Sequence, residues 1–413
     1  MVIAMIFINE LRRLWKGKQS KIFLGFIIII PIAFFLLFTR TMTSTVKYED
    51  GSLVHYSTKE SLEMRRKAEV KTDGTVTEER LLEGFDLYKR NLEKGFIKDN
   101  LREDYMAYAP MINLIQELAF YPPYIDDFKY DNGNDITKDF VNNFYTIRDK
   151  KVEKIFGYNF PKDSDRSKDK ITELNKKIEK PFVFSPGYKF WGVSIEHLGM
   201  ITVILSFVCL IFNSSIFSEV YDNRVDDIIK TTRYGRKDIT IAKIFSHIIS
   251  SILLYFLSIG IYVAILSVFL GTEGLNTSFQ IRYIYSVAPM TLKQVLLSII
   301  VGGLVSMLAM SAVMMLISSL TKKPSQSLTL GILVFVVFTF IGLYIMPMGQ
   351  LPRLLLGMLP SSGSGIIMFD SLRGMDIIYG VWGPYFRVFF NAIVAILGFL
   401  MAGAIYNKKE STS

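Results

Sequence analysis

The chain has 413 residues, of which half are hydrophobic, and a formal net charge of +9. Its apolar residues are concentrated in residues 22–39 and from residue 198 onward, which is typical of a polytopic membrane protein and excludes a soluble protein of two or three domains. The single cysteine, Cys209, excludes an intrachain disulfide, and the three widely spaced histidines predict no metal site.

Residues 1–21 have the periodicity of an amphipathic helix. Basic residues opposite an apolar face that includes a tryptophan are typical of a helix lying in the lipid headgroup layer. We therefore expect an in-plane helix in contact with membrane lipid; the alternative is a basic leader that only sets the topology. The residues expected to define this helix are Leu11, Arg12, Arg13 and Trp15.

Six runs without Asp, Glu, Lys or Arg are each long enough to cross a bilayer as a helix. The first, within residues 22–40, could instead be a cleaved signal peptide, but the long amphipathic segment before it and the poor cleavage site TRTMTST favour an uncleaved anchor. The runs are Ile22–Thr39, Leu198–Phe217, Ile244–Leu270, Val295–Leu320, Leu328–Met346 and Val388–Tyr406.

Lysine and arginine are enriched in residues 1–21, in residues 217–243 and after the sixth run, and they are sparse in the intervening links. The excess of basic residues marks the cytoplasmic side. We expect a multi-pass protein of the cell membrane, in a bacterial plasma membrane, with both termini cytoplasmic and residues 41–192 extracellular.

Residues 41–192 carry nearly balanced acidic and basic charge, so the net positive charge belongs to the membrane part and reflects topology; we expect no nucleic-acid partner. Apolar steps of three and four predict mostly helices in this region, one of them starting with a capping box of Thr75 and Glu78. We find no catalytic constellation here. The predicted fold is an all-α polytopic membrane protein with six transmembrane helices and a large, mainly helical extracellular domain between the first and second.

Residues 217–243 are too rich in charge to cross the membrane, because each charge at the bilayer centre costs roughly 2.5–3.5 kcal/mol. They predict a short helix with an apolar stripe, ended by Gly235. Such a helix fits a groove in another protein; the alternative, a helix on lipid headgroups, is disfavoured by its acidic residues. The stripe consists of Tyr221, Val225, Ile228 and Ile229, with Asp226 beside it and Arg236 after it.

Residues 193–413 form the predicted core of spans two to six, and within them residues 347–387 contain apolar patches interrupted by Pro, Gly and Arg. No patch is long enough to cross, so we expect re-entrant or interfacial helices on the outer side.

In order, these features resemble the membrane-spanning subunits of ABC-2 type ATP-binding-cassette transporters. An amphipathic start precedes the first span, and the outer link RYIYSVAPMT separates the third and fourth spans. The resemblance covers the chain except residues 41–192. The cytoplasmic pattern that matches is Glu219, Ile228, Ile229, Gly235, Arg236 and Lys243.

The resemblance implies that residues 217–243 meet a separate ATPase. The chain has no G-x-x-x-x-G-K-[ST] motif, so we expect it not to be an enzyme and to hold no cofactor, with ATP and Mg in the partner. The expected partners are two ABC ATPase subunits and a second permease, identical or paralogous. We expect export of an amphipathic peptide, lipid or drug-like substrate; the alternative is a sensor or mechanotransmitter whose ATPase moves the outer domain without cargo.

Overall fold

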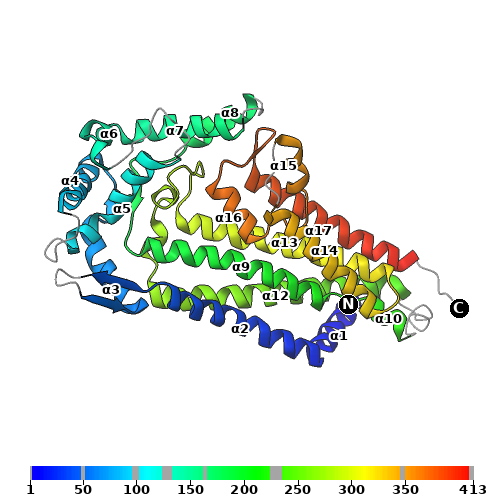
Figure 1. The fold of residues 1–413 in the computed structure, drawn as a ribbon. Helices are drawn as coiled ribbons and strands as arrows, with labels where there is room; N and C mark the ends of the chain where they lie inside the picture. Colours follow the sequence, from blue (N-terminus) through cyan, green and yellow to red (C-terminus); the bar gives the residue numbers. More distant parts are fainter. Residues whose placement is uncertain are drawn as a thin grey trace.

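The structure, a computed structural model, describes residues 2–47, 52–94, 102–122, 133–160, 165–223, 235–344 and 349–408. Long helices run side by side along the molecule, and a separate helical unit covers one end of them (Figure 1). Helix α1, the short helix α10 and the last turns of α17 lie at the opposite end. The bundle therefore has two different ends, which we call the domain end and the α10 end.

Six helices within the described residues are long and apolar enough to cross a membrane, which confirms the number predicted from the uncharged runs. The second one begins at Tyr188 and not at Leu198, so that it includes Lys189 and Glu196. Glu196 is tolerated there because it accepts a hydrogen bond from the Arg282 guanidinium at 2.7 Å. The six are α2 (Lys18–Thr41), α9 (Tyr188–Phe212), α12 (Gly235–Leu270), α13 (Leu292–Leu320), α14 (Pro324–Tyr344) and α17 (Gly383–Lys408).

Helix α13 is the centre of the bundle and contacts α9, α17, α12 and α14. Its close approach to α9 and α12 depends on Gly303, because a Cβ there would lie 2.6 Å from the hydroxyl oxygen of Tyr255 and 2.8 Å from the side chain of Thr202. Tyr255 in turn donates a hydrogen bond to the carbonyl of Ile300 at 2.8 Å. Helices α9, α12 and α13 are thus closely packed at Gly303.

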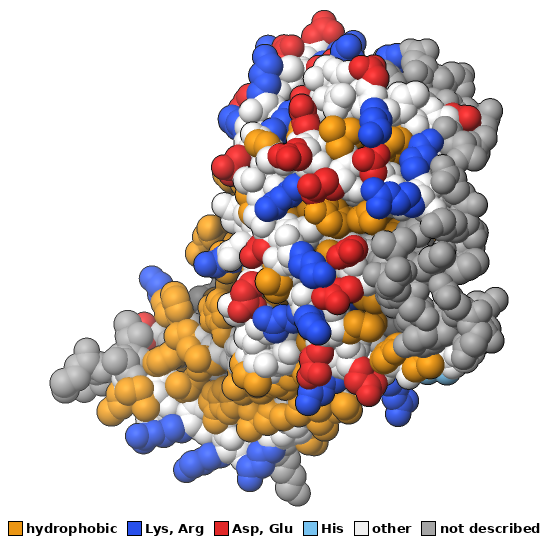
Figure 2. All heavy atoms as spheres, turned by 90° about the vertical axis from the view of Figure 1, so that its left-hand side faces the viewer, with side chains coloured by type: hydrophobic (Ala, Val, Ile, Leu, Met, Phe, Trp, Pro, Cys, Tyr) orange, Lys and Arg blue, Asp and Glu red, His pale blue; other side chains and the backbone are white. Residues whose placement is uncertain are grey.

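Between α2 and α9 the chain folds into a unit of short helices, whose aromatic residues Phe144, Phe182 and Phe184 belong to a hydrophobic core that continues into the spans. From the domain end, acidic and basic side chains mix over the upper part of the surface, and hydrophobic side chains gather in the lower part (Figure 2). Its helices are α3 (Thr58–Glu69), α4 (Glu78–Lys94), α5 (Arg102–Phe120), α6 (Lys138–Asn142), α7 (Phe144–Asn159) and α8 (Asp165–Lys176), with the 3-10 turns η1 (Val70–Thr72) and η4 (Gly133–Asp135).

Two antiparallel pairs of short strands belong to this unit. The predicted capping box of Thr75 and Glu78 is wrong, because Thr75 pairs with Val183 in a strand and the Thr77 hydroxyl instead accepts from the Arg80 N–H at 3.4 Å. The pairs are β1 (Ser44–Lys47) with β2 (Leu53–Tyr56) and β3 (Gly74–Thr75) with β4 (Val183–Phe184).

A buried arginine joins the helical unit to the link between α12 and α13. Arg148 of α7 is fully buried and donates to the carbonyls of Ile284 at 2.9 Å and Ser286 at 2.7 Å. It also contacts the amide oxygen of Asn175 and pairs with Asp149 at 3.1 Å. We call Arg148 with these partners the Arg148 latch. The link that it holds contains η5 (Glu273–Asn276) and η6 (Phe279–Ile281).

A second connection between the helical unit and the spans uses a buried carboxyl group. Glu69, at the end of α3, is 2% exposed and accepts a hydrogen bond from the Gly187 N–H at 2.9 Å, where α9 begins. Burial raises the pKa of Glu69 from 4.5 to about 7, although the Gly187 hydrogen bond and the charges of Arg65 and Lys189 partly oppose the shift.

We expect Glu69→Gln to stabilise the protein at pH 8 and to have a smaller effect at pH 5. A carboxyl whose folded pKa is raised contributes stability that is fully present below its unfolded pKa of 4.5 and is lost as the pH rises toward 7. The full difference corresponds to about 3 kcal/mol at 1.36 kcal/mol per unit. Thermal unfolding of both proteins in detergent measures it, and Glu117, whose pKa burial also raises to about 7, cancels because both proteins contain it. An equal stability difference at the two pH values would contradict this explanation.

The region 349–382 folds against the domain end of the bundle without a helix long enough to cross. Helix α16 (Gly365–Arg373) lies against α9 and α13, and at Gly199 a Cβ would come within 3.0 Å of the backbone of Gly365. Arg387 of α17 fixes the following turn through a bond of 2.9 Å to Asp376. The other elements are α15 (Gln350–Gly357), β5 (Ile377–Ile378) and β6 (Val381–Trp382).

Candidate coupling site

Helix α10 (Ser218–Asp222) is attached to the ends of three spans. The fully buried ring of Phe217, its N-cap residue, stacks on Tyr406 of α17 with ring centroids 4.5 Å apart. The N–H groups of Phe217 and Ser218 both donate to the Ser318 hydroxyl of α13 at 3.1 Å. These contacts join the start of α10 to α13 and α17.

A small hydrophobic core surrounds this attachment. Val220 of α10 is buried in it, together with residues from the nearby ends of α12, α13 and α17. Helix α14 also contacts the turn before α10, because the Ser327 hydroxyl donates a hydrogen bond to the carbonyl of Ser214 at 2.6 Å. The core, which we call the α10 seat, consists of Ile216, Phe217, Val220, Ile244, Met315, Ala402 and Tyr406.

One helical turn before the seat, Asn213 is a buried polar junction of three helices. Its side-chain amide donates to Ser251 of α12 and to Ser311 of α13, both at 3.2 Å. Its oxygen lies 3.0 Å from Nδ1 of His247 on α12. Because an apolar surrounding makes an unpaired polar group costly, this junction favours one fixed arrangement of α9, α12 and α13.

Helix α1 (Val2–Lys16) packs along α12 at the same end of the bundle. The half-buried Trp15 donates its indole N–H to the Ser250 hydroxyl at 3.1 Å, so that α12 covers part of the apolar face of α1. Ser20 contacts the carbonyl of Leu14 and closes the bend between α1 and α2. A force on α1 therefore reaches α12 directly.

The other residues expected on the N-terminal helix lie as follows. Leu11 is half-buried, whereas Arg12 and Arg13 are exposed. Glu10, which interrupts the amphipathic pattern, pairs with Arg13 at 3.0 Å and so remains on the charged side.

The structure describes some of the residues expected in the coupling segment and not others, because it leaves out residues 224–234. Glu219 is exposed on α10, and Tyr221 is half-buried with its ring 5.6 Å from that of Tyr406. Tyr221 thus contacts this chain's own bundle. Gly235 is the first residue of α12, and the side chain of Arg236 is outside the description. Val225, Asp226, Ile228 and Ile229 also lie outside the described residues.

Sequence reasoning missed the residues that attach α10 to the spans. Phe217 was the last residue of an apolar run, and Tyr406 ended another run far along the chain. The one available signal was the polar turn NSS at residues 213–215, which interrupts the predicted second span. In the structure this turn follows the end of α9 at Phe212 and leads into α10.

Six apolar helices around a tightly packed centre define a polytopic α-helical membrane protein. The sequence matches the ABC-2 family transporter proteins over residues 4–360, and the chain belongs to this family. The match includes residues 41–192, which the resemblance in the sequence motifs does not cover. No curated protein matches the chain significantly. Family membership makes the chain the permease subunit of an ABC transporter, a non-catalytic membrane component that works with ABC ATPase subunits.

Proposed function

We propose that this permease exports an amphipathic peptide, lipid or drug-like substrate, driven by ATP hydrolysis in its partner. The observation that carries the mechanism is the α10 seat: α10 exposes Glu219 on one side and buries Phe217 and Val220 against α12, α13 and α17 on the other. A partner that moves α10 would move these spans as rigid bodies. We further propose that the α10 end is cytoplasmic, as its basic residues indicate.

The proposed assembly contains two ATPase subunits and a second permease, identical to this chain or paralogous. ATP and Mg are bound in the partner, and residues 217–243 form the contact through which the work is transmitted. Among the described residues no group of three His, Cys, Asp or Glu side chains could hold a metal ion. The exposed apolar residues along α2, α14 and α17 provide the surfaces toward lipid or a second permease.

A second candidate function is a mechanotransmitter in which the ATPase moves the helical unit at the domain end and no cargo crosses. The Arg148 latch favours it, because the latch connects that unit to the link between α12 and α13. Reconstituted vesicles distinguish the two functions. ATP-dependent movement of a peptide or lipid supports export, whereas ATP turnover with altered binding to the helical unit and no movement of any candidate supports signalling.

We expect Val225→Asp combined with Ile228→Asp to separate the permease from its ATPase without affecting insertion or folding. Two charges on the apolar stripe would have to be buried unpaired in the ATPase groove, which costs several kcal/mol. Co-purification and ATP turnover of the reconstituted complex measure the effect. Lys323→Gln, an exposed change just before α14 and outside residues 217–243, is the control. A double variant that co-purifies with full ATP turnover would show that this segment is not the docking site.

A further inference from the structure

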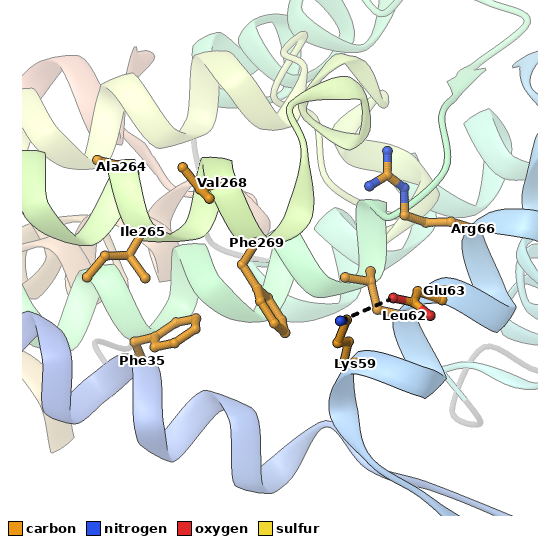
Figure 3. A pocket seen from close by; sticks show the side chains of 9 residues that line it. All are labelled: Phe35, Lys59, Leu62, Glu63, Arg66, Ala264, Ile265, Val268 and Phe269. Carbon is orange, nitrogen blue, oxygen red and sulfur yellow. Dashed lines mark ion pairs between the residues drawn. The ribbon is translucent and has the colours of Figure 1, made fainter.

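A groove lies where the helical unit meets the spans, between α2, α12 and α3. It has a volume of about 620 Å³. Its apolar wall comes from Phe35 of α2 and from Ile265 and Phe269 of α12, and the rings of Phe35 and Phe269 meet edge to face with centroids 5.4 Å apart (Figure 3). The groove is thus an apolar slot between two membrane-spanning helices near the domain end of the bundle.

The slot continues into the outer surface of the spans. Val268, which also lines it, is 90% exposed, and Phe256 and Leu257 on α12 are exposed further along the same helix. On α2 the neighbouring Leu36 is exposed as well. Since these side chains belong to membrane-spanning helices, the groove opens sideways toward the hydrocarbon of the bilayer. An acyl chain can therefore enter from the membrane without passing through water.

Charged side chains of α3 border the other side of the groove. Lys59 lies 3.9 Å from Glu63, and Arg66 lies 3.0 Å from Glu273 of η5 (Figure 3 shows the first pair). The side chains of Lys59 and Glu63 are largely exposed, and exposed pairs of this kind contribute little to stability. Lys59 can therefore turn toward a phosphate at the groove, which Arg66 also lines, and the carboxylate of Glu63 provides the charge opposite to an ammonium group.

We propose that this groove binds a zwitterionic membrane phospholipid, phosphatidylethanolamine in type, with one acyl chain between α2 and α12 and its phosphate at Lys59 and Arg66. An apolar slot that opens to the bilayer and is lined by Lys59, Arg66 and Glu63 matches an amphiphile whose headgroup carries both signs. The bound lipid would contact α2, α12 and the helical unit at once. This proposal concerns a binding site and stands whether or not the protein exports cargo.

The test is photolabelling of the full-length protein in vesicles that contain phosphatidylethanolamine with a diazirine in one acyl chain. Labelled peptides are identified by mass spectrometry. We expect the peptide containing Ile265, Val268 and Phe269 to be labelled at least threefold more than the lipid-facing peptide of α17 around Tyr385 and Phe389, which serves as the internal reference at the same end of the bundle. A diacylglycerol probe with the same chain lacks the phosphate and should lose this preference.

Two variants complete the test. Lys59→Gln should reduce groove labelling to the reference level, whereas Lys67→Gln, an exposed lysine of α3 outside the groove, should not. Val268→Trp should block the slot with little effect on folding, because Val268 is exposed. Equal labelling of the groove and α17 peptides would overturn the proposal by showing ordinary boundary lipid. Equal labelling by phosphatidylethanolamine and diacylglycerol would also overturn it.

Discussion

Replacing Phe217 with alanine should leave the ATPase bound to the permease but abolish the movement of the spans that ATP drives. The Phe217 ring is fully buried and stacks on Tyr406, so its removal opens a cavity beneath α10. Truncating a buried phenylalanine costs about 3–5 kcal/mol, which exceeds what a five-residue helix can recover locally. The exposed side of α10 is unchanged. The variant therefore tests transmission, whereas the double variant at Val225 and Ile228 tests docking.

Span movement can be measured with spin labels at the domain end, far from Phe217. Cys209, the only cysteine, is fully buried, so cysteines introduced at Val268 of α12 and Tyr385 of α17 will be labelled selectively. In the complex we expect ATP to change the distance between these labels when Phe217 is present. In Phe217→Ala we expect no change in that distance, although ATP turnover continues.

Two controls define the result. Phe217→Leu keeps most of the buried volume and should retain most of the distance change. Phe245→Ala removes an exposed ring from α12 and should have no effect. A normal ATP-dependent distance change in Phe217→Ala would show that α10 does not transmit the movement through its seat.

The sequence was sufficient for the spans because crossing a membrane depends on the length and composition of one continuous run. It was less accurate at the ends of the spans. Helix α9 begins at Tyr188, well before the uncharged run, and contains Glu196, whose charge is paired with Arg282. In the sequence such a charge looks like the end of a membrane span, because its partner lies far along the chain. Helix α12 likewise includes Lys243, which is buried, although the uncharged run begins only at Ile244.

The contacts that join the elements could not be predicted, because they connect residues far apart in the chain. Nothing around Arg148 distinguishes it from the other basic residues of a charged region, and its acceptors at Ile284 and Ser286 are main-chain carbonyls. Any residue type could supply such a carbonyl, so no sequence pattern marks it. The same is true of Phe217 and Tyr406, which looked like ordinary ends of apolar runs.

Replacing Arg148 with methionine should break the Arg148 latch and release the helical unit from the link between α12 and α13. Methionine keeps much of the packing volume but leaves the carbonyl of Ile284 without the side-chain donor that Arg148 supplies. The carbonyl of Ser286 loses its 2.7 Å bond and keeps only the longer one from Gln280, and Asp149 keeps its pair with Lys180. Leaving a buried hydrogen-bond acceptor without its donor costs about 1–3 kcal/mol. Burial lowers the pKa of Arg148, but the ordinary pKa of an arginine is so high that its guanidinium remains charged near neutral pH. The loss should therefore be nearly the same at pH 6 and pH 8.

Hydrogen exchange measures this release directly, as lost protection of the amides in residues 279–288 and in α8. Lys150→Met removes the same charge from an exposed position on the same helix and should change nothing. Unchanged protection in Arg148→Met would show that the latch does not hold the unit in place.

The variant also separates the two proposed functions. If the unit is moved to send a signal, Arg148→Met should eliminate the ATP-dependent change in what the unit binds, because the spans would then move without it. If the spans export cargo between them, transport should survive the variant, since α9, α12 and α13 remain joined at Asn213 and at Gly303.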